Sequence, residues 1–497
     1  MKIGMISRAL KFSFTFSAVA TLLFFSGATF AGLSPVSPDH DGFEIQPNPP
    51  ISGGGDGNHS DTQHVWANTA SDYNANGSWA ATAPAAGDVG AFNTAPTMQP
   101  VLTSSLSNAG LFFSAISGYD LSASAGATLT LTGVATSAGG AEASNSNAAA
   151  IGATNVSGSN TIDAPIFLSP ASGVQSSFVQ SPGGTLIVNG AISSALGINL
   201  SLRGGGTIQL NGANSFTTAS IDTANETVIL GNDSALGVGS FVINNTSTLQ
   251  ASGGPRSIAN PIFFNGNTTI SGTNAFTFTG PVAAQNSNSR TLTVTNTGGV
   301  TFNGSVALEE VGASAGRGLI INGNSPVTFN GVISNGDSAA AFLKYSGTST
   351  LTLNNSNTFS GGFSATASGA AINANADGAL GLGNVSLTAG LITLTLQNGV
   401  TQNYIADSGN LSIVTNDTVN LNFVGVDTIG ALIVNGVSQP LGLYGASATN
   451  PNGEFSGTGL LLVTAIVAVP EHSTWTMLVM GAALLLGVQR WRRRRTI

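Results

Sequence analysis

Short runs in which hydrophobic and polar residues alternate fill the chain between residues 65 and 465. Three of them read Thr-Leu-Ile-Val-Asn-Gly at 185–190, Thr-Ile-Gln-Leu-Asn-Gly at 207–212 and Thr-Leu-Thr-Leu-Asn at 350–354. A period of two predicts β-strands, and Asn-Gly closes a strand well because both residues tolerate positive φ. No long window in this region carries a helical stripe of apolar positions. We therefore expect an all-β body.

A longer duplication predicts how these strands are arranged. The segment 206–216 (Gly-Thr-Ile-Gln-Leu-Asn-Gly-Ala-Asn-Ser-Phe) leads to Ala-Leu-Gly-Val-Gly at 235–239, and 349–359 (Ser-Thr-Leu-Thr-Leu-Asn-Asn-Ser-Asn-Thr-Phe) leads to Ala-Leu-Gly-Leu-Gly at 379–383. Repeats of this kind stack as a solenoid, in which each coil of about 20–25 residues adds strands in parallel register. We expect a parallel β-helix, with left-handed Asn residues stacked as a ladder at its corners. The alternative is an array of small β-sandwich domains, which would need linkers within the body.

The duplicated segment resembles the passenger-associated repeat of autotransporter-type proteins. That repeat reads roughly Gly-x-Leu-x-Leu-x-Gly-x-Asn-x-Phe/Tyr-x-Gly-Gly, followed by Ala-Leu-Gly-x-Gly. The copy over 349–383 is the better match, since Thr217 and Thr218 stand where the first copy would have Gly-Gly. The resemblance implies a β-solenoid body over 59–465.

Both ends of this body are similar to the same family. The opening pattern of the family matches Trp66, Tyr73, Trp79, 84–88 and 92–93, and the closing pattern matches 434–438, 442–446 and 455–459. The resemblance therefore implies an N-terminal cap region at 59–130 and closing strands at 430–465.

The N-terminus has the composition of a secretory signal peptide. Lys2, Arg8 and Lys11 precede an apolar stretch at 12–25, and Thr-Phe-Ala at 29–31 supplies small residues at the spacing that signal peptidase reads. We expect a signal helix in 1–31 with cleavage after Ala31; Ala28 is a second candidate, and an uncleaved anchor is the alternative. Residues 32–58, rich in Pro and Gly, are predicted to be a flexible leader.

The C-terminal segment has the layout of a single membrane anchor. Residues 475–488 carry no charge, and the uncharged stretch 473–489 spans about 25 Å as a helix, somewhat short of a bilayer core. Trp475 and Trp491 can anchor at the interfaces. The arginines that follow predict a cytoplasmic end by the positive-inside rule, with the body on the other side. A buried core helix is the alternative, but such helices do not usually end in a block of arginines.

The same segment, 469–497, resembles the PEP-CTERM sorting signal of Gram-negative bacteria. The motif residues are Val469, Pro470, Glu471, His472, Ser473, Thr474 and Trp475, and the topology anchors are Arg490, Arg492, Arg493, Arg494 and Arg495. Pro470 and Glu471 match the family's Pro-Glu-Pro, whereas His472 departs from it. The resemblance implies processing by signal peptidase and exosortase, a transient tether in the inner membrane facing the periplasm, and a final place at the cell surface or outside. It also implies a link to biofilm and the exopolysaccharide matrix.

Charge narrows the range of partners. Between residues 32 and 489 lie five of the thirteen basic residues, Arg203, Arg256, Arg290, Arg317 and Lys344, and all twenty-two acidic residues, so this span carries 5 − 22 = −17. Nucleic acid and anionic polysaccharide are therefore not electrostatically favoured, whereas a neutral exopolysaccharide is compatible. The absence of cysteine excludes disulfides and thiolate chemistry.

The sequence predicts no catalytic residue, metal site or cofactor. The four histidines are His40, His59, His64 and His472, so residues 65–471 contain none, and Gly-Ala-Ser-Ala-Gly at 312–316 lacks the histidine base that a Gly-x-Ser-x-Gly nucleophile needs. Asp56, His59, Asp61 and His64 could in principle ligate a metal, but we interpret them as a solvated segment. We expect a structural or adhesion-type protein. The alternative, a polysaccharide lyase or hydrolase, would need two convergent carboxylates or a basic residue beside an Asp cluster.

Overall fold

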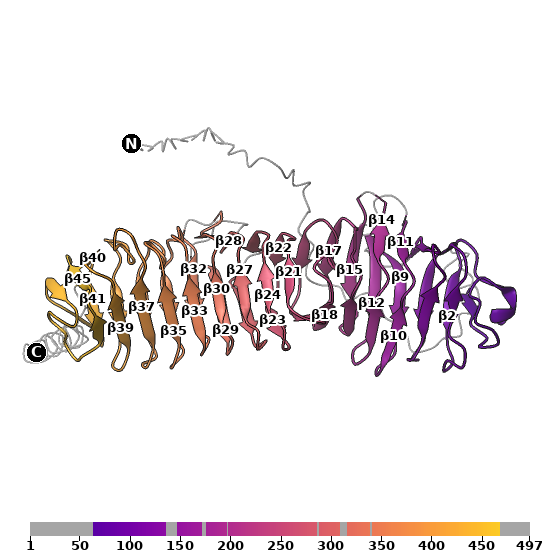
Figure 1. The fold of residues 1–497 in the computed structure, drawn as a ribbon, viewed down its shortest axis with the longest axis horizontal. Helices are drawn as coiled ribbons and strands as arrows, with labels where there is room; N and C mark the ends of the chain where they lie inside the picture. The colour runs from indigo at the N-terminus through magenta and orange to yellow at the C-terminus, as the bar shows by residue number, and fades with distance from the viewer. Residues whose placement is uncertain are drawn as a thin grey trace, which may run out of the picture. The chain divides into compact units, whose positions relative to one another are not determined.

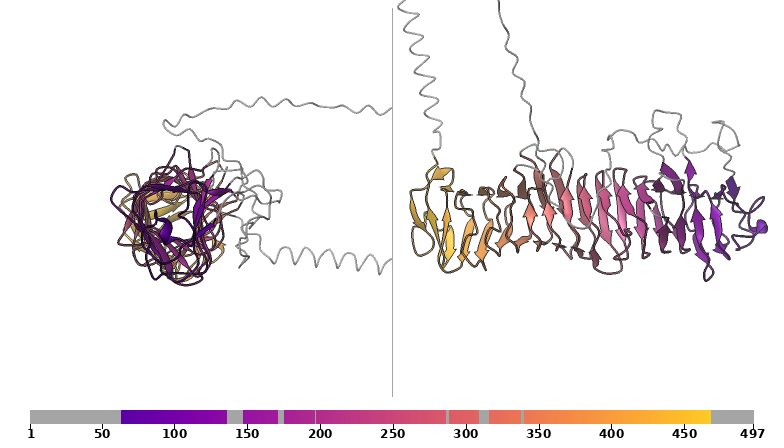
Figure 2. Two further views of the ribbon diagram at one scale, coloured as in Figure 1. Left: turned by 90° about the vertical axis from the view of Figure 1, so that its right-hand side faces the viewer. Right: turned by 90° about the horizontal axis from the view of Figure 1, so that it is seen from above.

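The computed structural model describes residues 63–135, 147–170, 175–195, 197–285, 288–308, 316–337 and 340–467. These residues form a parallel β-solenoid of about 14 turns. In Figure 1 the coils follow one another along a single axis in chain order, from β2 (Val89–Phe92) to β45 (Leu460–Val463), and Figure 2 shows the same stack end-on. The expected β-helical body is confirmed, and the alternative of separate sandwich domains is excluded.

The coils are built from three faces, each of which is a sheet along the stack, and two of these faces are interrupted. The first face contains β1 (Gln63–Val65), β2, β5 (Gly110–Phe113), β9 (Asn147–Ala153), β12 (Gln175–Gln180), β15 (Asn199–Arg203), β17 (Thr218–Ile221), β19 (Phe241–Ile243), β22 (Ile262–Phe264), β25 (Val282–Ala284), β28 (Val306–Ala307) and β31 (Ile333–Ser334), with β8 (Val134–Ala135) beside β9.

The second face is the longest. It contains β3 (Val101–Leu102), β6 (Asp120–Ala123), β10 (Ser159–Ile162), β13 (Thr185–Val188), β16 (Thr207–Leu210), β18 (Glu226–Leu230), β20 (Ser247–Ala251), β23 (Thr268–Ser271), β26 (Arg290–Val294), β29 (Gly318–Gly323), β32 (Phe342–Tyr345), β34 (Phe363–Ala365), β36 (Val385–Leu387), β38 (Leu411–Ile413), β41 (Leu432–Val434) and β42 (Val437–Ser438).

The third face is divided into two sheets. One contains β4 (Leu106–Asn108), β7 (Leu129–Leu131), β11 (Ile166–Leu168) and β14 (Ile192–Ser194); the other contains β21 (Arg256–Ile258), β24 (Phe276–Phe278), β27 (Val300–Phe302), β30 (Val327–Phe329), β33 (Thr350–Leu353), β35 (Ala371–Ala374), β37 (Thr393–Gln397), β39 (Thr418–Asn422) and β44 (Phe455–Gly457). A last small sheet contains β40 (Val426–Ile429), β45 and β43 (Gly442–Tyr444).

Alternation within each strand builds the core. On the second face Thr207, Thr227, Thr248 and Thr269 lie in register one coil apart and point outward, at steps of 20, 21 and 21 residues. Their inward neighbours, Ile208, Val228, Leu249 and Ile270, are at most 1% exposed. Each such side chain contributes about 1.5–3 kcal/mol by burial, so a chain without disulfides is stabilised by these interior columns.

An asparagine ladder runs along the end of the third face. Asn330 Nδ2 donates to Asn303 Oδ1, Asn354 Nδ2 to Asn330 Oδ1, and Asn375 Nδ2 to Asn354 Oδ1, each at 2.7 Å. The expected ladder is therefore present, but the expected left-handed conformation is wrong, because none of these residues has positive φ. The physical reason is that their backbones still belong to the strand ladder: Asn330 and Asn354 donate N–H groups to carbonyls of the preceding coil.

Each copy of the duplicated segment interrupts one face. The third face ends at β14 and resumes at β21, and the chain between them passes through 214–216 and 235–239 at this place in the coil. The first face ends at β31, and the next strand at the same place in the coil is β40. Residues 357–359 and 379–383 lie between these two strands. The same sequence motif therefore stands on two different faces.

One asparagine in each copy covers the edge of the strand that ends there. Asn214 Oδ1 accepts the N–H of Ile192 at 2.8 Å, and its Nδ2 donates to the carbonyl of Ala235 at 2.7 Å. In the second copy Asn357 bonds Ile333 N–H and the Ala379 carbonyl in the same way, at 2.7 and 2.6 Å. Both asparagines are buried. The motif thus satisfies backbone groups that a broken sheet would otherwise leave unpaired.

The glycine of Ala-Leu-Gly has a steric reason in both copies. Gly237 and Gly381 have φ of 73° and 78°. A Cβ added to them would lie 2.4 Å from the carbonyl oxygen of Phe216 and 2.6 Å from that of Phe359. Only glycine fits a left-handed residue that approaches another backbone this closely.

Aromatic side chains close the N-terminal end. Trp66 and Trp79 form a β-bridge, and their rings meet edge to face with centroids 5.1 Å apart. The 3₁₀ helix η1 (Asn76–Ser78) precedes Trp79, whose Nε1 donates to the Tyr73 carbonyl at 2.8 Å. Phe92 stacks on the ring of Phe113, with centroids 4.8 Å apart. These rings are buried and fill the interior of the first coil.

The C-terminal end changes from parallel to antiparallel pairing. Strand β42 folds back on β41, and β43 runs antiparallel to β45. The last described hydrogen bond joins the Val467 N–H to Ser438 Oγ at 3.2 Å.

Candidate functional site

The predicted processing and sorting residues lie outside the described part of the chain. This applies to Ala31, to Val469, Pro470, Glu471, His472, Ser473, Thr474 and Trp475, and to Arg490, Arg492, Arg493, Arg494 and Arg495. The signal at 1–31, the leader at 32–58 and the helix at 475–488 lie outside it as well, and all of these remain predictions. Over the described ranges, which exclude both termini, no helix is long and apolar enough to span a bilayer.

Of the four candidate metal ligands, only His64 is described, and it belongs to the first coil. Its Nε2 lies 3.2 Å from Asp88 Oδ2, and its Nδ1 lies 2.6 Å from the carbonyl oxygen of Thr82. Asp88 Oδ2 also accepts the N–H of Ala85 at 2.8 Å. Among the described residues no three His, Cys, Asp or Glu side chains come together. The contacts of His64 are thus those of a cap residue.

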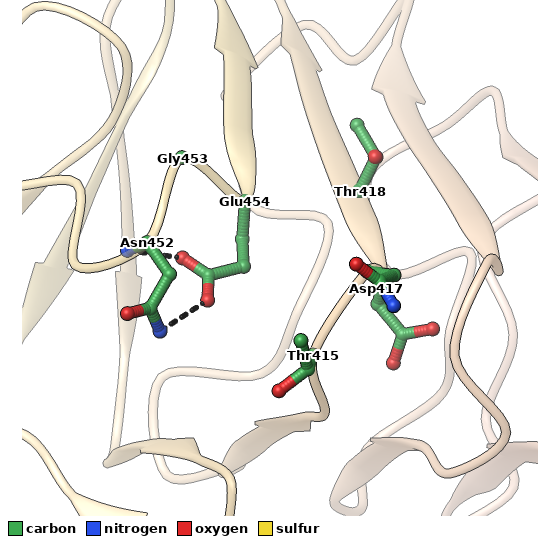
Figure 3. Close-up of a pocket in the computed structure, with 7 residues that line it drawn as sticks. Thr415, Asp417, Thr418, Asn452, Gly453 and Glu454 are labelled. Atoms are coloured by element: carbon green, nitrogen blue, oxygen red, sulfur yellow. Dashed lines mark hydrogen bonds between the residues drawn. The ribbon is translucent and has the colours of Figure 1, made fainter.

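A small pocket near the C-terminal end brings two carboxylates together. Strands β39 and β44 pair with Val419 opposite Phe455, which places Asp417 and Glu454 at the same edge. The pocket encloses about 200 Å³ and is lined by Thr415, Asn416, Asp417, Thr418, Asn452, Gly453 and Glu454 (Figure 3). The two acids are far apart in sequence, so no local pattern could have indicated their proximity.

Both carboxylates in this pocket already accept hydrogen bonds from their surroundings. Asp417 accepts the N–H groups of Ile392 and Val414, each at 3.0 Å. Glu454 accepts the N–H of Asn452 at 2.8 Å and its side-chain amide at 2.7 Å. Figure 3 shows the Glu454 carboxylate turned toward Asn452, away from Asp417. A glycosidase pair needs free carboxylates that face each other across the substrate, whereas these two fix the shapes of their own turns.

Two further carboxyl groups lie inside the solenoid. Glu226 Oε2 accepts the N–H of Gly205 at 2.7 Å, and Asp427 Oδ2 accepts those of Tyr404 and Ile405, each at 3.2 Å. In each acid the other oxygen is buried and has no hydrogen-bond partner among the described residues. Burial raises the pKa of Glu226 to about 8 and that of Asp427 to about 7, the latter also through the charges of Asp407 and Asp377. Sequence inspection missed both, since alternation alone does not show which acidic residues point inward.

The outer surface of the third face is a continuous row of neutral polar groups. Thr277, Thr301, Thr328 and Thr352 lie in register on successive coils, and the row continues through Asn373. All of them are partly exposed. Hydroxyl and amide groups at one-coil spacing can exchange hydrogen bonds with an uncharged polymer, while offering no fixed charge to an ionic one.

No protein-family model, curated protein or solved structure matches this chain.

Proposed function

We propose that this chain is an exported cell-surface or extracellular protein with a structural or adhesive role. The observation that carries the proposal is the uninterrupted coil-to-coil pairing of the second face, from β3 to β41, which makes the body one continuous scaffold. The row from Thr277 to Asn373 gives this scaffold a neutral hydrogen-bonding surface. Such a surface suits a neutral exopolysaccharide of a biofilm matrix better than it suits an ionic polymer.

The carboxylate geometry supports a scaffold over a polysaccharide-active enzyme. Asp417 and Glu454 line one pocket, but each is held by donors of the turns around it. Since a general acid and base must reach the substrate, we give these residues a structural role. An assay of the purified protein on neutral and anionic polysaccharides tests this point, because bond cleavage lost in Glu454→Gln would overturn it.

Deletion of the body tests the adhesive role. Cells that express the chain without residues 60–465, but with both termini, are expected to lose attachment and matrix retention. A second variant exchanges the outward Thr277, Thr301 and Thr328 for alanine and keeps the inward core; it should also weaken attachment, because these residues belong to the proposed binding row. Unchanged attachment after the full deletion would remove the role.

Sorting is tested by the mass of the exported protein. We infer that the signal is removed after Ala31 and that 469–497 holds the chain in the inner membrane until exosortase processes it. Intact mass spectrometry of the mature protein is expected to show loss of 1–31 and of the C-terminal helix and arginines. His472→Pro restores the family motif, so it should process at least as completely. A mature form that retains 470–497 would contradict exosortase processing.

A further inference from the structure

The last sheet of the solenoid has an aliphatic outer face. In β40, β45 and β43 the outward positions include the aliphatic residues Val426, Leu460, Leu462 and Leu443, with the polar Thr428 opposite Leu462. Val426 lies opposite Leu460, and Leu462 lies opposite Leu443. We group them with Leu441, two residues before Leu443, and with Ile466, three residues after the end of β45, and call these six residues the terminal apolar face. Leu441 and Ile466 are 58% and 63% exposed.

This face differs in composition from the outer row of the third face. The corresponding outward row on the third face consists of threonine and asparagine. Residues 428–467 contain a single charged side chain, Glu454, and its carboxylate is bonded to Asn452. Asp427 lies between Val426 and Thr428 but points inward and is fully buried. An uncharged aliphatic sheet face of this kind is typical of a surface that another apolar phase covers.

The path of the chain indicates what covers it. After β45 the described chain continues past Ile466 to Val467, whose N–H donates to Ser438 Oγ of β42. Only residues 467–474 separate Ile466 from Trp475, where the predicted membrane stretch 475–488 begins. The nine residue steps from Ile466 to Trp475 can reach about 32 Å at most when fully extended. If that stretch spans a bilayer, the terminal apolar face is held within this distance of the lipid surface.

We propose that the terminal apolar face docks on the surface of the bilayer that holds the C-terminal segment. This inference rests on the proposed function, because it takes 469–497 to be the membrane anchor. The chemistry is that of aliphatic side chains entering the region between headgroups and acyl chains, where binding grows with the apolar area buried. Since the face carries no basic residue, it should bind zwitterionic lipid and require no anionic lipid. Docking would fix the end of the rod against the membrane.

Site-specific labels can test this docking, because the chain contains no cysteine. Single variants Leu443→Cys, Val238→Cys and Gly481→Cys of the full chain are labelled with a polarity-sensitive dye and reconstituted into phosphatidylcholine vesicles. Val238 is the matched control, an aliphatic residue 73% exposed in the first duplicated segment. We expect the labels at 443 and 481 to shift to shorter wavelength and to be quenched several-fold more slowly by a water-soluble quencher. The label at 238 should not change.

The outcomes separate docking from tethering. If the 481 label is protected but the 443 label stays as accessible as the one at 238, docking is overturned and tethering stands. If the 481 label stays accessible, tethering fails and docking fails with it. Protection at 443 that rises with protein concentration before vesicles are added would show that a second copy covers the face, which also overturns the proposal.

A second set of variants checks the contact surface itself. Leu443→Asn with Leu462→Asn makes two outward positions polar and leaves the buried Leu461 and Val463 unchanged. A label at Ile466→Cys should be protected by vesicles in the parent chain and become accessible in this double variant. Equal protection in both backgrounds would show that the tail alone places residue 466 near lipid and would overturn docking by the aliphatic face.

Discussion

The two copies of the duplicated segment have the same local structure on different faces of the solenoid. In each, a buried asparagine bonds the first N–H of a terminating strand and a carbonyl in the next coil, and a left-handed glycine passes over a phenylalanine. The first copy interrupts the third face and the second copy the first face. The motif therefore ends a sheet without leaving backbone N–H and carbonyl groups unpaired, whichever face of the coil it lies on.

One buried position is ionisable in the first copy and apolar in the second. Glu226 begins β18 in the first copy, one position before Thr227, which pairs with Thr207. In the second copy the corresponding position, one before Ala371, which pairs with Thr350, is Ala370. Both are fully buried, but only the first is ionisable. The same backbone device thus encloses a titratable group in one copy and an apolar one in the other.

Truncation of the phenylalanines should have a large effect that is equal in the two copies. Phe216→Ala and Phe359→Ala each remove a fully buried ring beneath the glycine turn, so each should cost about 3–5 kcal/mol. Native-state hydrogen exchange of amides in the neighbouring strands measures the local free energy of opening. A cost in one copy that is less than half of that in the other would show that the copies are not equivalent.

The local free energy of unfolding should depend on pH in the first copy and not in the second. The pKa of Glu226 is about 8 in the folded chain against about 4.5 when unfolded, so the native state binds the proton more tightly. Stability in the first copy should therefore be greatest below about pH 4.5 and fall as pH rises to about 8, by about 1.4 kcal/mol per pKa unit of difference. Glu226→Gln should abolish this dependence, and exchange near Ala370 should show none. A flat profile around Glu226 in the parent chain would contradict the buried acid.

Removal of the asparagine caps should have a smaller effect. Asn214→Ala and Asn357→Ala each leave one N–H and one carbonyl without their partner, which should cost about 2 kcal/mol if water enters the vacated space. The amides of Ile192 and Ile333 should exchange faster, because their acceptor is gone. Slow exchange of these amides in the alanine variants would mean that another group accepts them.

The smallest difference in stability between the two copies should come from removal of their ladder asparagines. In the second copy Asn354 accepts a hydrogen bond from the side chain of Asn375. In the first copy the position equivalent to Asn375 is Gly231, so no ladder asparagine donates to Asn211 from there. Asn354→Ala should cost about 1 kcal/mol and Asn211→Ala somewhat less, because these bonds are exposed to solvent. Denaturant unfolding of both variants measures this, and a larger cost for Asn211→Ala would reverse the expected order.

Most of the fold could be predicted from alternation and repetition, as with the Thr207 and Thr350 strands. Which face is interrupted could not be predicted, because Asn214 and Asn357 have the same sequence context but lie on different faces. The outward direction of Leu460 and Leu462 also could not be predicted, because the run Leu-Leu-Leu-Val at 460–463 contains no polar residue to mark the solvent side. The proximity of Asp417 and Glu454 could not be predicted either, because it depends on the register of two strands. The predicted sorting residues fall outside the described chain and remain predictions.

The short step between paired strands has a kinetic consequence. Because Thr207, Thr227 and Thr248 pair at 20 and 21 residues, the sequence separation of contacting residues stays small however long the stack becomes. Low contact order favours fast folding, and stacked repeats can propagate from a formed edge. The aromatic first coil supplies such an edge at the N-terminal side. A chain of this kind can fold coil by coil as it emerges end-first, without waiting for its C-terminus.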